Sequence, residues 1–149
     1  MNIEVEFKSL IAILEAEKID YAVVGGFAVA IWGAPRATTD IDLLVRPSDV
    51  DQVLGLVRAL GYDLEAAPMT FQDGMQIRRV TRIDDAEVLT LDLLLVNANL
   101  EDVWKTRSTV LTEAGPVCVV SREGLIRMKI AANRPQDISD VARLREQDR

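Results

Sequence analysis

Histidine is absent from the 149-residue sequence, and cysteine occurs once, at Cys118. Without an imidazole, neither Ser-His-Asp nor Cys-His catalysis is available. One cysteine cannot form an internal disulfide, and the sequence has no Cys or His cluster for zinc. Cys118 stands in an apolar run, so we expect a small buried side chain there. A metal site in this chain would therefore need oxygen ligands.

Long apolar runs are also missing, because Gly25, Pro35 and Asp92 interrupt the longest ones before they reach the roughly 18 residues of a membrane helix. The N-terminal residues are charged and amphipathic, which does not fit a signal peptide. No internal repeat or low-complexity segment occurs. With 49% hydrophobic and 28% charged residues, the sequence predicts one globular domain over residues 1–149, in the cytoplasm and without a membrane segment.

Positive charge is in the minority, since 17 basic and 24 acidic residues give a net charge of −7. This balance argues against a broad nucleic-acid-binding surface. Arginines nevertheless gather at residues 78–82, and basic residues at residues 122–134. A local site for an RNA end or a triphosphate therefore stays open, and so does the simpler interpretation of ion-paired surface groups.

A glycine pair, Gly25-Gly26, follows an apolar strand expected over residues 19–24 and precedes a helix expected over residues 27–32. Glycine lets the backbone turn sharply and lets a phosphate approach the amides at a helix start, where the helix dipole favours anions. Tight packing of the helix on the strand would also explain the pair. The sequence around it is neither a Walker loop nor a Gly-x-Gly-x-x-Gly fingerprint.

Two aspartates, Asp40 and Asp42, lie in the next apolar strand, which is expected over residues 39–45. Side chains alternate along a strand, so both carboxylates point to the same side. Like charges this close raise each other's pKa and need a cation, a hydrogen-bond network or a proton to relieve them. Mg²⁺, which binds carboxylates together with substrate phosphates and water, is the simplest relief.

A third aspartate, Asp92, stands among leucines in a strand expected over residues 88–96. Residues 75–82 are expected to pair with this strand as a hairpin, with an acidic turn between them. A lone carboxylate among leucines is costly to bury without a partner. The presence of this carboxylate would be explained if the strand of Asp92 lay beside the strand of Asp40 and Asp42.

Helices are expected at residues 3–18, 50–60, 100–105 and 122–132, and a last one begins at Pro135. In the last helix we expect Ile138, Val141 and Leu144 to face the core. Residues 69–74 are expected to form a turn-rich connection. Helices that alternate with strands, together with one hairpin, predict a mixed α/β sheet covered by helices.

The order of these motifs resembles the nucleotidyltransferase superfamily with the polymerase-β-type fold. The matching segments are Val24-Gly25-Gly26, the following residues 27–39, Asp40-Ile41-Asp42-Leu43 and, later, Leu91-Asp92-Leu93. The residues that lead into Asp40 are most similar to small bacterial AbiEii-type toxins, and more distantly to minimal antibiotic nucleotidyltransferases: Gly33, Arg36, Thr38 and Thr39. The closing segment, residues 129–144, also resembles the AbiEii-type group. The resemblance implies an α/β (α+β) fold, with a core over residues 19–120 and a short C-terminal helical pair over residues 121–146.

The resemblance also implies transfer of a nucleoside monophosphate from an NTP to an acceptor hydroxyl, with release of pyrophosphate. Asp40 and Asp42 would hold Mg²⁺ or Mn²⁺ on the triphosphate, and Asp92 would complete a second metal position near the acceptor. The expected nucleotide contacts are Gly25, Gly26, Arg36, Thr39 and Lys129. Two of these have a structural alternative, because Arg36 could brace Asp42 and Lys129 could pair with Asp137 or Asp140.

Several acceptors stay open. Likeness to AbiEii-type toxins implies an RNA or tRNA end or a protein as acceptor, and a cognate antitoxin as partner. A small-molecule enzyme of the aminoglycoside- or lincosamide-modifying kind is the alternative, and the acidic charge favours a cationic drug. A module that binds nucleotide or a partner without catalysis is a third possibility, and a homodimer also stays open.

Overall fold

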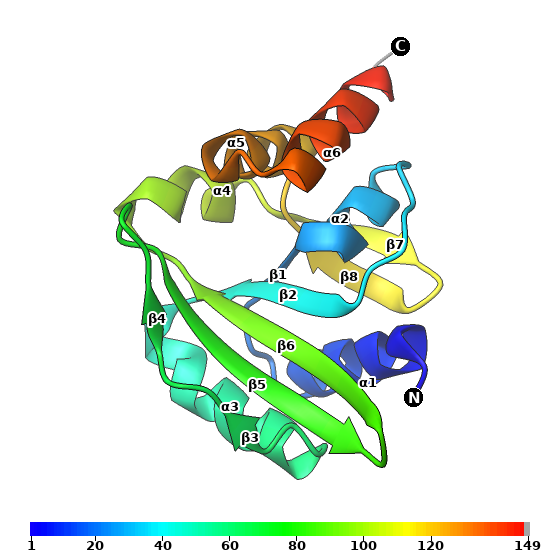
Figure 1. Ribbon diagram of the computed structural model, residues 1–149, viewed down its shortest axis with the longest axis vertical. Coiled ribbons are helices and arrows are strands. Elements are labelled where there is room, and N and C mark those ends of the chain that lie inside the picture. The colour runs from blue at the N-terminus through cyan, green and yellow to red at the C-terminus, as the bar shows by residue number, and fades with distance from the viewer. Residues whose placement is uncertain (148–149) are drawn as a thin grey trace.

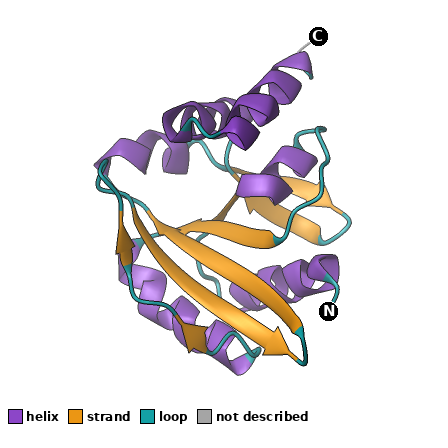
Figure 2. Cartoon of the chain, in the orientation of Figure 1, coloured by secondary structure: helices purple, strands orange, loops and turns teal. Residues whose placement is uncertain are grey.

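A mixed sheet of eight strands runs through the protein and carries helices on both faces (Figure 1, Figure 2). The computed structural model describes residues 1–147, so the last two residues of the predicted domain lie outside the described residues. The strands are β1 (Ala22–Val24), β2 (Asp40–Val45), β3 (Leu64–Glu65), β4 (Met69–Thr70), β5 (Gln76–Asp84), β6 (Glu87–Leu95), β7 (Ser108–Thr112) and β8 (Gly115–Val119).

The helices follow the predicted order along the chain. They are α1 (Ile3–Ala16), α2 (Gly25–Ile31), α3 (Val50–Ala59), α4 (Glu101–Lys105), α5 (Arg122–Ala132) and α6 (Pro135–Glu146), with short 3-10 turns η1 (Pro47–Asp49) and η2 (Ala98–Leu100). Among the described residues, no helix combines the length and the apolar character that a bilayer crossing requires.

The strand order is β3-β5-β6-β2-β1-β8-β7, and β4 pairs with β5. β2 lies near the middle, antiparallel to β1 and parallel to β6. β5 and β6 form the predicted antiparallel hairpin. The structure therefore confirms the mixed α/β sheet, and it makes the two strands that carry aspartates direct neighbours.

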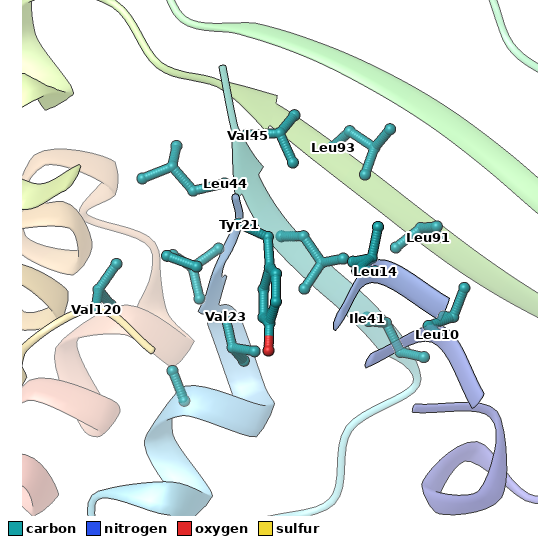
Figure 3. Close-up of a cluster of buried hydrophobic side chains, with 14 of the residues drawn as sticks. Leu10, Leu14, Tyr21, Val23, Ile41, Leu44, Val45, Leu91, Leu93 and Val120 are labelled. Atoms are coloured by element: carbon teal, nitrogen blue, oxygen red, sulfur yellow. The ribbon is translucent and has the colours of Figure 1, made fainter. Parts of the chain in front are cut away.

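One face of the sheet packs against α1 and forms the largest part of the core (Figure 3). Fully buried side chains there come from α1, β2 and β6: Leu10, Leu14, Ile41, Leu91 and Leu93. Because side chains alternate along a strand, Asp40, Asp42 and Asp92 point to the opposite face. The apolar alternation that builds the core thus also places the three carboxylates together.

Most predicted elements are present, with ends that differ by a few residues. α2 begins at Gly25, so the glycine pair forms the first residues of the helix and not a turn before it. The prediction of a turn-rich connection at residues 69–74 was wrong in part, because Met69 and Thr70 pair with β5 as β4. Cross-strand pairing, which local turn signals do not report, accounts for this difference.

The buried face of helix α6 differs from the predicted one. Val141 and Leu144 are buried as expected, but Ile138 is 60% exposed. Asp137 and Asp140 are buried in its place. Ion pairs with neighbouring elements, described below, explain why two carboxylates face inward where an apolar stripe was expected.

Candidate active site

Three aspartates meet on one face of the sheet where β2 and β6 run side by side. In the register of the two strands, Asp42 lies opposite Asp92 and Asp40 lies opposite Thr90. Residues in register on neighbouring strands project to the same face. The structure therefore brings Asp40, Asp42 and Asp92 together, although 50 residues separate Asp42 from Asp92 in the sequence.

Asp42 has the most strongly perturbed carboxyl group of the three. Burial, followed by repulsion from Asp92 and Asp40, raises the pKa of Asp42 from its ordinary 3.8 to about 7. Lys129 and Arg134 oppose this shift by favouring the charged form, but they do not cancel it. A carboxyl group that lacks enough local positive charge is suited to a cation or a cationic transition state.

Asp92 already has a partner, Arg79 on β5. The Arg79 guanidinium donates Nε–H to Oδ1 at 2.8 Å and Nη2–H to Oδ2 at 2.9 Å. The two residues are direct cross-strand neighbours in the hairpin. This bidentate geometry fixes the orientation of the Asp92 carboxylate and gives its negative charge a partner.

The carboxylates of Asp40 and Asp42 are better placed than the carboxylate of Asp92 to bind a hard divalent cation. Asp42 carries unrelieved negative charge beside Asp40, which a divalent ion would neutralise. Both oxygens of Asp92 instead accept hydrogen bonds from Arg79. Within residues 1–147, no three acidic or cysteine side chains are grouped closely enough to hold a metal ion. A three-carboxylate site would therefore require Arg79 to release Asp92.

Gly25 stands against Asp42 at the point where β1 passes into α2. Its φ of +68° lies in the left-handed region, and a Cβ atom built there would stand 2.2 Å from Oδ2 of Asp42. Only glycine allows both the backbone conformation and this close approach. The glycine thus lets the Asp42 carboxylate pack directly against the backbone at the start of α2, the end of a helix where backbone N–H groups lack partners within the helix.

We expect Gly25→Ala to abolish activity and to cost more stability than the roughly 1–2 kcal/mol of a left-handed alanine, because its Cβ also collides with Asp42. Gly74→Ala is a matched control, since Gly74 has a φ of +84° and no atom within 4 Å of its would-be Cβ. Urea unfolding of both variants separates the two effects. Equal losses of stability would show that contact with Asp42 is not the reason for the glycine.

The segment between α2 and β2 contacts the second glycine of the pair. A Cβ atom on Gly26 would stand 2.7 Å from Oγ1 of Thr38 and 3.4 Å from Nη1 of Arg36. The Thr38 hydroxyl donates to the Asp40 carbonyl at 3.1 Å and so fixes the start of β2. Thr39, predicted as a nucleotide contact, is exposed next to this point.

Arg36 and Lys129 take part in a buried ion cluster with Asp137 and Asp140 of α6. Arg36 makes a bidentate pair with Asp140 at 2.9 and 3.1 Å. Lys129 lies 2.9 Å from Asp140 and 3.3 Å from Asp137. Of the alternatives left open by the sequence, Lys129 forms the ion pairs with both aspartates, and Arg36 braces Asp140 rather than Asp42.

Arg134 adds a third cation to this cluster. Its Nε–H donates to Asp137 at 2.6 Å, yet its side chain is 73% exposed. Arg36, Lys129 and Arg134 together outnumber the two buried carboxylates, which leaves an excess of positive charge. Arg134 and Lys129 also favour the ionised form of Asp42. The helical pair therefore directs positive charge toward Asp42.

Sequence reasoning missed Arg79 and Arg134 as members of the site. The register of the hairpin could have identified Arg79, because a turn at residues 85–86 places it opposite Asp92. For Arg134 the available signal is its spacing of three residues to Asp137 at the start of a helix. Thr38 was noticed only for its resemblance to other sequences, and its backbone contact depends on the tertiary structure.

Solved nucleotidyltransferase structures share the fold of this chain. The antibiotic-resistance factor ANT(2″)-Ia, solved in complex with adenylyl-2″-tobramycin, gives a TM-score of 0.65 at 17% identity and covers 96% of this chain and 88% of its own. An antigenic nucleotidyltransferase-like protein from Paracoccidioides brasiliensis gives a TM-score of 0.59 at 20% identity. The match covers 92% of this chain and 72% of that protein. The protein TM1012 from Thermotoga maritima gives a TM-score of 0.63 at 13% identity. The match covers 97% of this chain and 93% of that protein. At such identities the likeness establishes the fold alone.

A search of curated protein sequences finds no match. The family model described as nucleotidyltransferase of unknown function (DUF6036) matches residues 2–145, which is nearly the whole chain. The protein therefore belongs to this nucleotidyltransferase family.

Proposed function

We propose that the protein is a metal-dependent enzyme that transfers a nucleoside monophosphate from an NTP to an acceptor hydroxyl and releases pyrophosphate. The observation that carries the proposal is the alignment of Asp42 with Asp92 across β2 and β6, with Asp40 on the same face. The raised pKa of Asp42 supports it, because this carboxyl group lies where a cation would relieve repulsion. Family membership supports the same class of reaction.

In this proposal Asp40 and Asp42 hold a Mg²⁺ or Mn²⁺ ion, and Asp92 is the third carboxylate of the site. A bound divalent ion would neutralise charge on the triphosphate. A phosphate would bind at the backbone N–H groups of Gly25 and Gly26, which open α2 next to Asp42. Thr39 is exposed next to β2, within the same end of the sheet.

The ion cluster that Arg36, Lys129 and Arg134 form with α6 would supply positive charge for the negatively charged nucleotide. Arg36 and Lys129 are committed to Asp137 and Asp140, so they contribute through the field that they create and through the position of α6. Arg134 also pairs with Asp137, but its side chain is 73% exposed, so it is the cation of the cluster that a phosphate oxygen would reach from the solvent.

Arg79 has a positioning role in this account. It holds the Asp92 carboxylate toward the site face while the acceptor is absent. When the acceptor hydroxyl binds next to Asp92, Arg79 would release one of the two carboxylate oxygens, and that oxygen would orient the hydroxyl and accept its proton. The catalytic effect of these residues is mainly positioning and neutralisation of charge.

We expect the affinity for Mg²⁺ to be about tenfold lower at pH 6 than at pH 8. With the pKa of Asp42 at about 7, a proton competes with the ion for this carboxylate in that range. Calorimetric titration of Mg²⁺ in the presence of a non-hydrolysable NTP measures the change. An affinity that is equal at both pH values, or no binding in the millimolar range, would count against an ion on Asp42.

A further inference from the structure

The face of the β5–β6 hairpin that carries Asp92 has properties of a docking surface. Residues paired across an antiparallel hairpin share a face. Three pairs flank the Arg79–Asp92 pair along this face: Ile77 with Leu94, Thr81 with Thr90, and Ile83 with Val88. Leu64 of β3, which pairs with Thr81, extends the same face. We call this set, together with Arg79 and Asp92, the hairpin face.

Large apolar side chains on the hairpin face are open to solvent. Val88 is 62% exposed, Leu64 is 56% exposed and Ile83 is 55% exposed. The alternate residues of the hairpin, such as Val80 and Leu91, are buried on the other side of the sheet. Figure 1 shows the broad side of β5 and β6 toward the viewer without a helix in front of it. Exposed apolar groups concentrated on one face are typical of an interaction site.

The hairpin face is continuous with the three aspartates. Val88 lies four residues before Asp92 on β6, which corresponds to about 13 Å along an extended strand. A chain that contacts Ile83 and Val88 would therefore reach Asp92 within about four extended residues. This geometry fits a polypeptide that presents a hydroxyl side chain beside Asp92.

The charge around the hairpin face selects against nucleic acid. In the described part of the chain, Arg79 is the one basic residue of the face, and it is paired with Asp92. Arg78 and Arg82 alternate to the other side of β5, where they pair with Glu65 and Glu6. Phosphate groups would find no free cation here, and phosphate contacts dominate the affinity of proteins for nucleic acid.

Carboxylates border the hairpin face instead. The exposed Asp85 lies at the tip of the hairpin, and the half-buried Asp40 of β2, in register with Thr90, lies on the same side of the sheet. An apolar centre with an acidic border is complementary to a segment that has apolar anchors and basic residues around them.

We propose that the acceptor is a Ser, Thr or Tyr hydroxyl on a basic segment of a partner protein that docks on the hairpin face. This inference rests on the proposed function. The acceptor oxygen forms a bond to the α-phosphorus of the NTP, and the bond from that phosphorus to the bridging oxygen breaks. The bridging oxygen leaves with its electron pair as part of pyrophosphate, and the acceptor proton passes to Asp92. The product is a nucleotidylated protein.

The test uses the purified protein, Mg²⁺, a total cell extract and each of four NTPs labelled at the α-phosphate. Ile83→Lys/Val88→Lys places two cations on the hairpin face about 13 Å or more from Asp92. Leu111→Lys is the matched control, because Leu111 is 82% exposed on β7, outside the hairpin face. Calorimetric binding of Mg²⁺ and a non-hydrolysable NTP verifies that each variant keeps its fold and its nucleotide site.

We expect label in proteins other than the enzyme itself, at a rate at least tenfold lower for Ile83→Lys/Val88→Lys and unchanged for Leu111→Lys. If the label enters RNA or small molecules, and this labelling is lost when Asp42 is replaced by asparagine, the inference is overturned while the proposed function stays intact. Equal labelling of protein by wild type and by the double variant would overturn the docking surface. No Asp42-dependent label in any fraction would overturn the proposed function, and the inference with it.

Discussion

Replacing Asp42 by asparagine is expected to abolish nucleotidyl transfer and, in metal-free buffer at pH 8, to raise the melting temperature. The side chain keeps its shape but loses the charge that a metal ion requires, so the rate should fall by at least about 10²- to 10³-fold. The stability gain arises because Asp42 is ionised above pH 7 in a mostly buried position, which costs free energy, and because Asp92 and Asp40 add repulsion. Asparagine removes this repulsion.

The sign of the effect follows from the two pKa values of Asp42. Between about pH 4 and pH 7 the folded protein keeps a proton on Asp42 that the unfolded chain has released. Stability is therefore lost as the pH rises through this window, and the loss is complete above pH 7. With 1.36 kcal/mol per pKa unit, the gain from Asp42→Asn is at most about 4 kcal/mol at pH 8 and disappears near pH 4.

Thermal unfolding of wild type and Asp42→Asn from pH 4 to pH 8 measures this dependence, and labelled NTP measures transfer in the same samples. Asp51→Asn, on the exposed side of α3, serves as a control that should change neither the transfer nor the pH profile. A variant that keeps its activity, or whose stability relative to wild type does not depend on pH, would contradict the assignment of Asp42.

Replacing Asp140 by alanine is expected to lower the free energy of unfolding by about 3–5 kcal/mol, which is typical when one partner of a buried ion pair is removed. Asp140 is 0% exposed and accepts hydrogen bonds or ion pairs from Arg36, Lys129 and Gln136. Burial alone would raise the pKa of Asp140, but these donors outweigh it, so its pKa lies below the ordinary value. Without the carboxylate, the buried Lys129 loses its ion pair at 2.9 Å and keeps the longer one, to Asp137 at 3.3 Å.

Urea unfolding of Asp140→Ala, Lys129→Met, Asp140→Leu and the double variant Lys129→Met/Asp140→Leu tests the cluster. The double variant should lose less stability than the sum of the losses of Lys129→Met and Asp140→Leu, because neither of these two buried ions remains without the other, although Arg36 still loses Asp140. Additive losses, or a cost below about 1 kcal/mol for Asp140→Ala, would show that the cluster does not hold α6 on the protein.

The parts of this protein that could be predicted from the sequence are those set by local periodicity. Alternation in β2 placed Asp40 and Asp42 on one face, and the comparisons confirm the nucleotidyltransferase superfamily and its fold. The toxin-like branch stays a prediction. The pairing of β2 with β6 was expected from resemblance, because nothing in the spacing of residues specifies which strands become neighbours.

What local patterns could not supply is the network of charges that joins distant segments. Arg36 meets Asp140 across 104 residues of sequence. Ile138 has the spacing of a core residue in α6, yet it is exposed because Asp137 and Asp140 hold the inward positions through their cations. Such pairs reverse the usual rule that apolar positions face the core, and they follow from the tertiary structure alone.

A crystal structure with Mg²⁺ and a non-hydrolysable NTP analogue would show whether Asp42 binds the metal ion. We expect an ion held by the carboxylates of Asp40 and Asp42, with the triphosphate against the backbone of Gly25 and Gly26 at the start of α2. We also expect Arg134 within hydrogen-bonding distance of a phosphate oxygen. A nucleotide bound elsewhere, or an ion that makes no contact with Asp42 at saturating Mg²⁺, would contradict the proposed site.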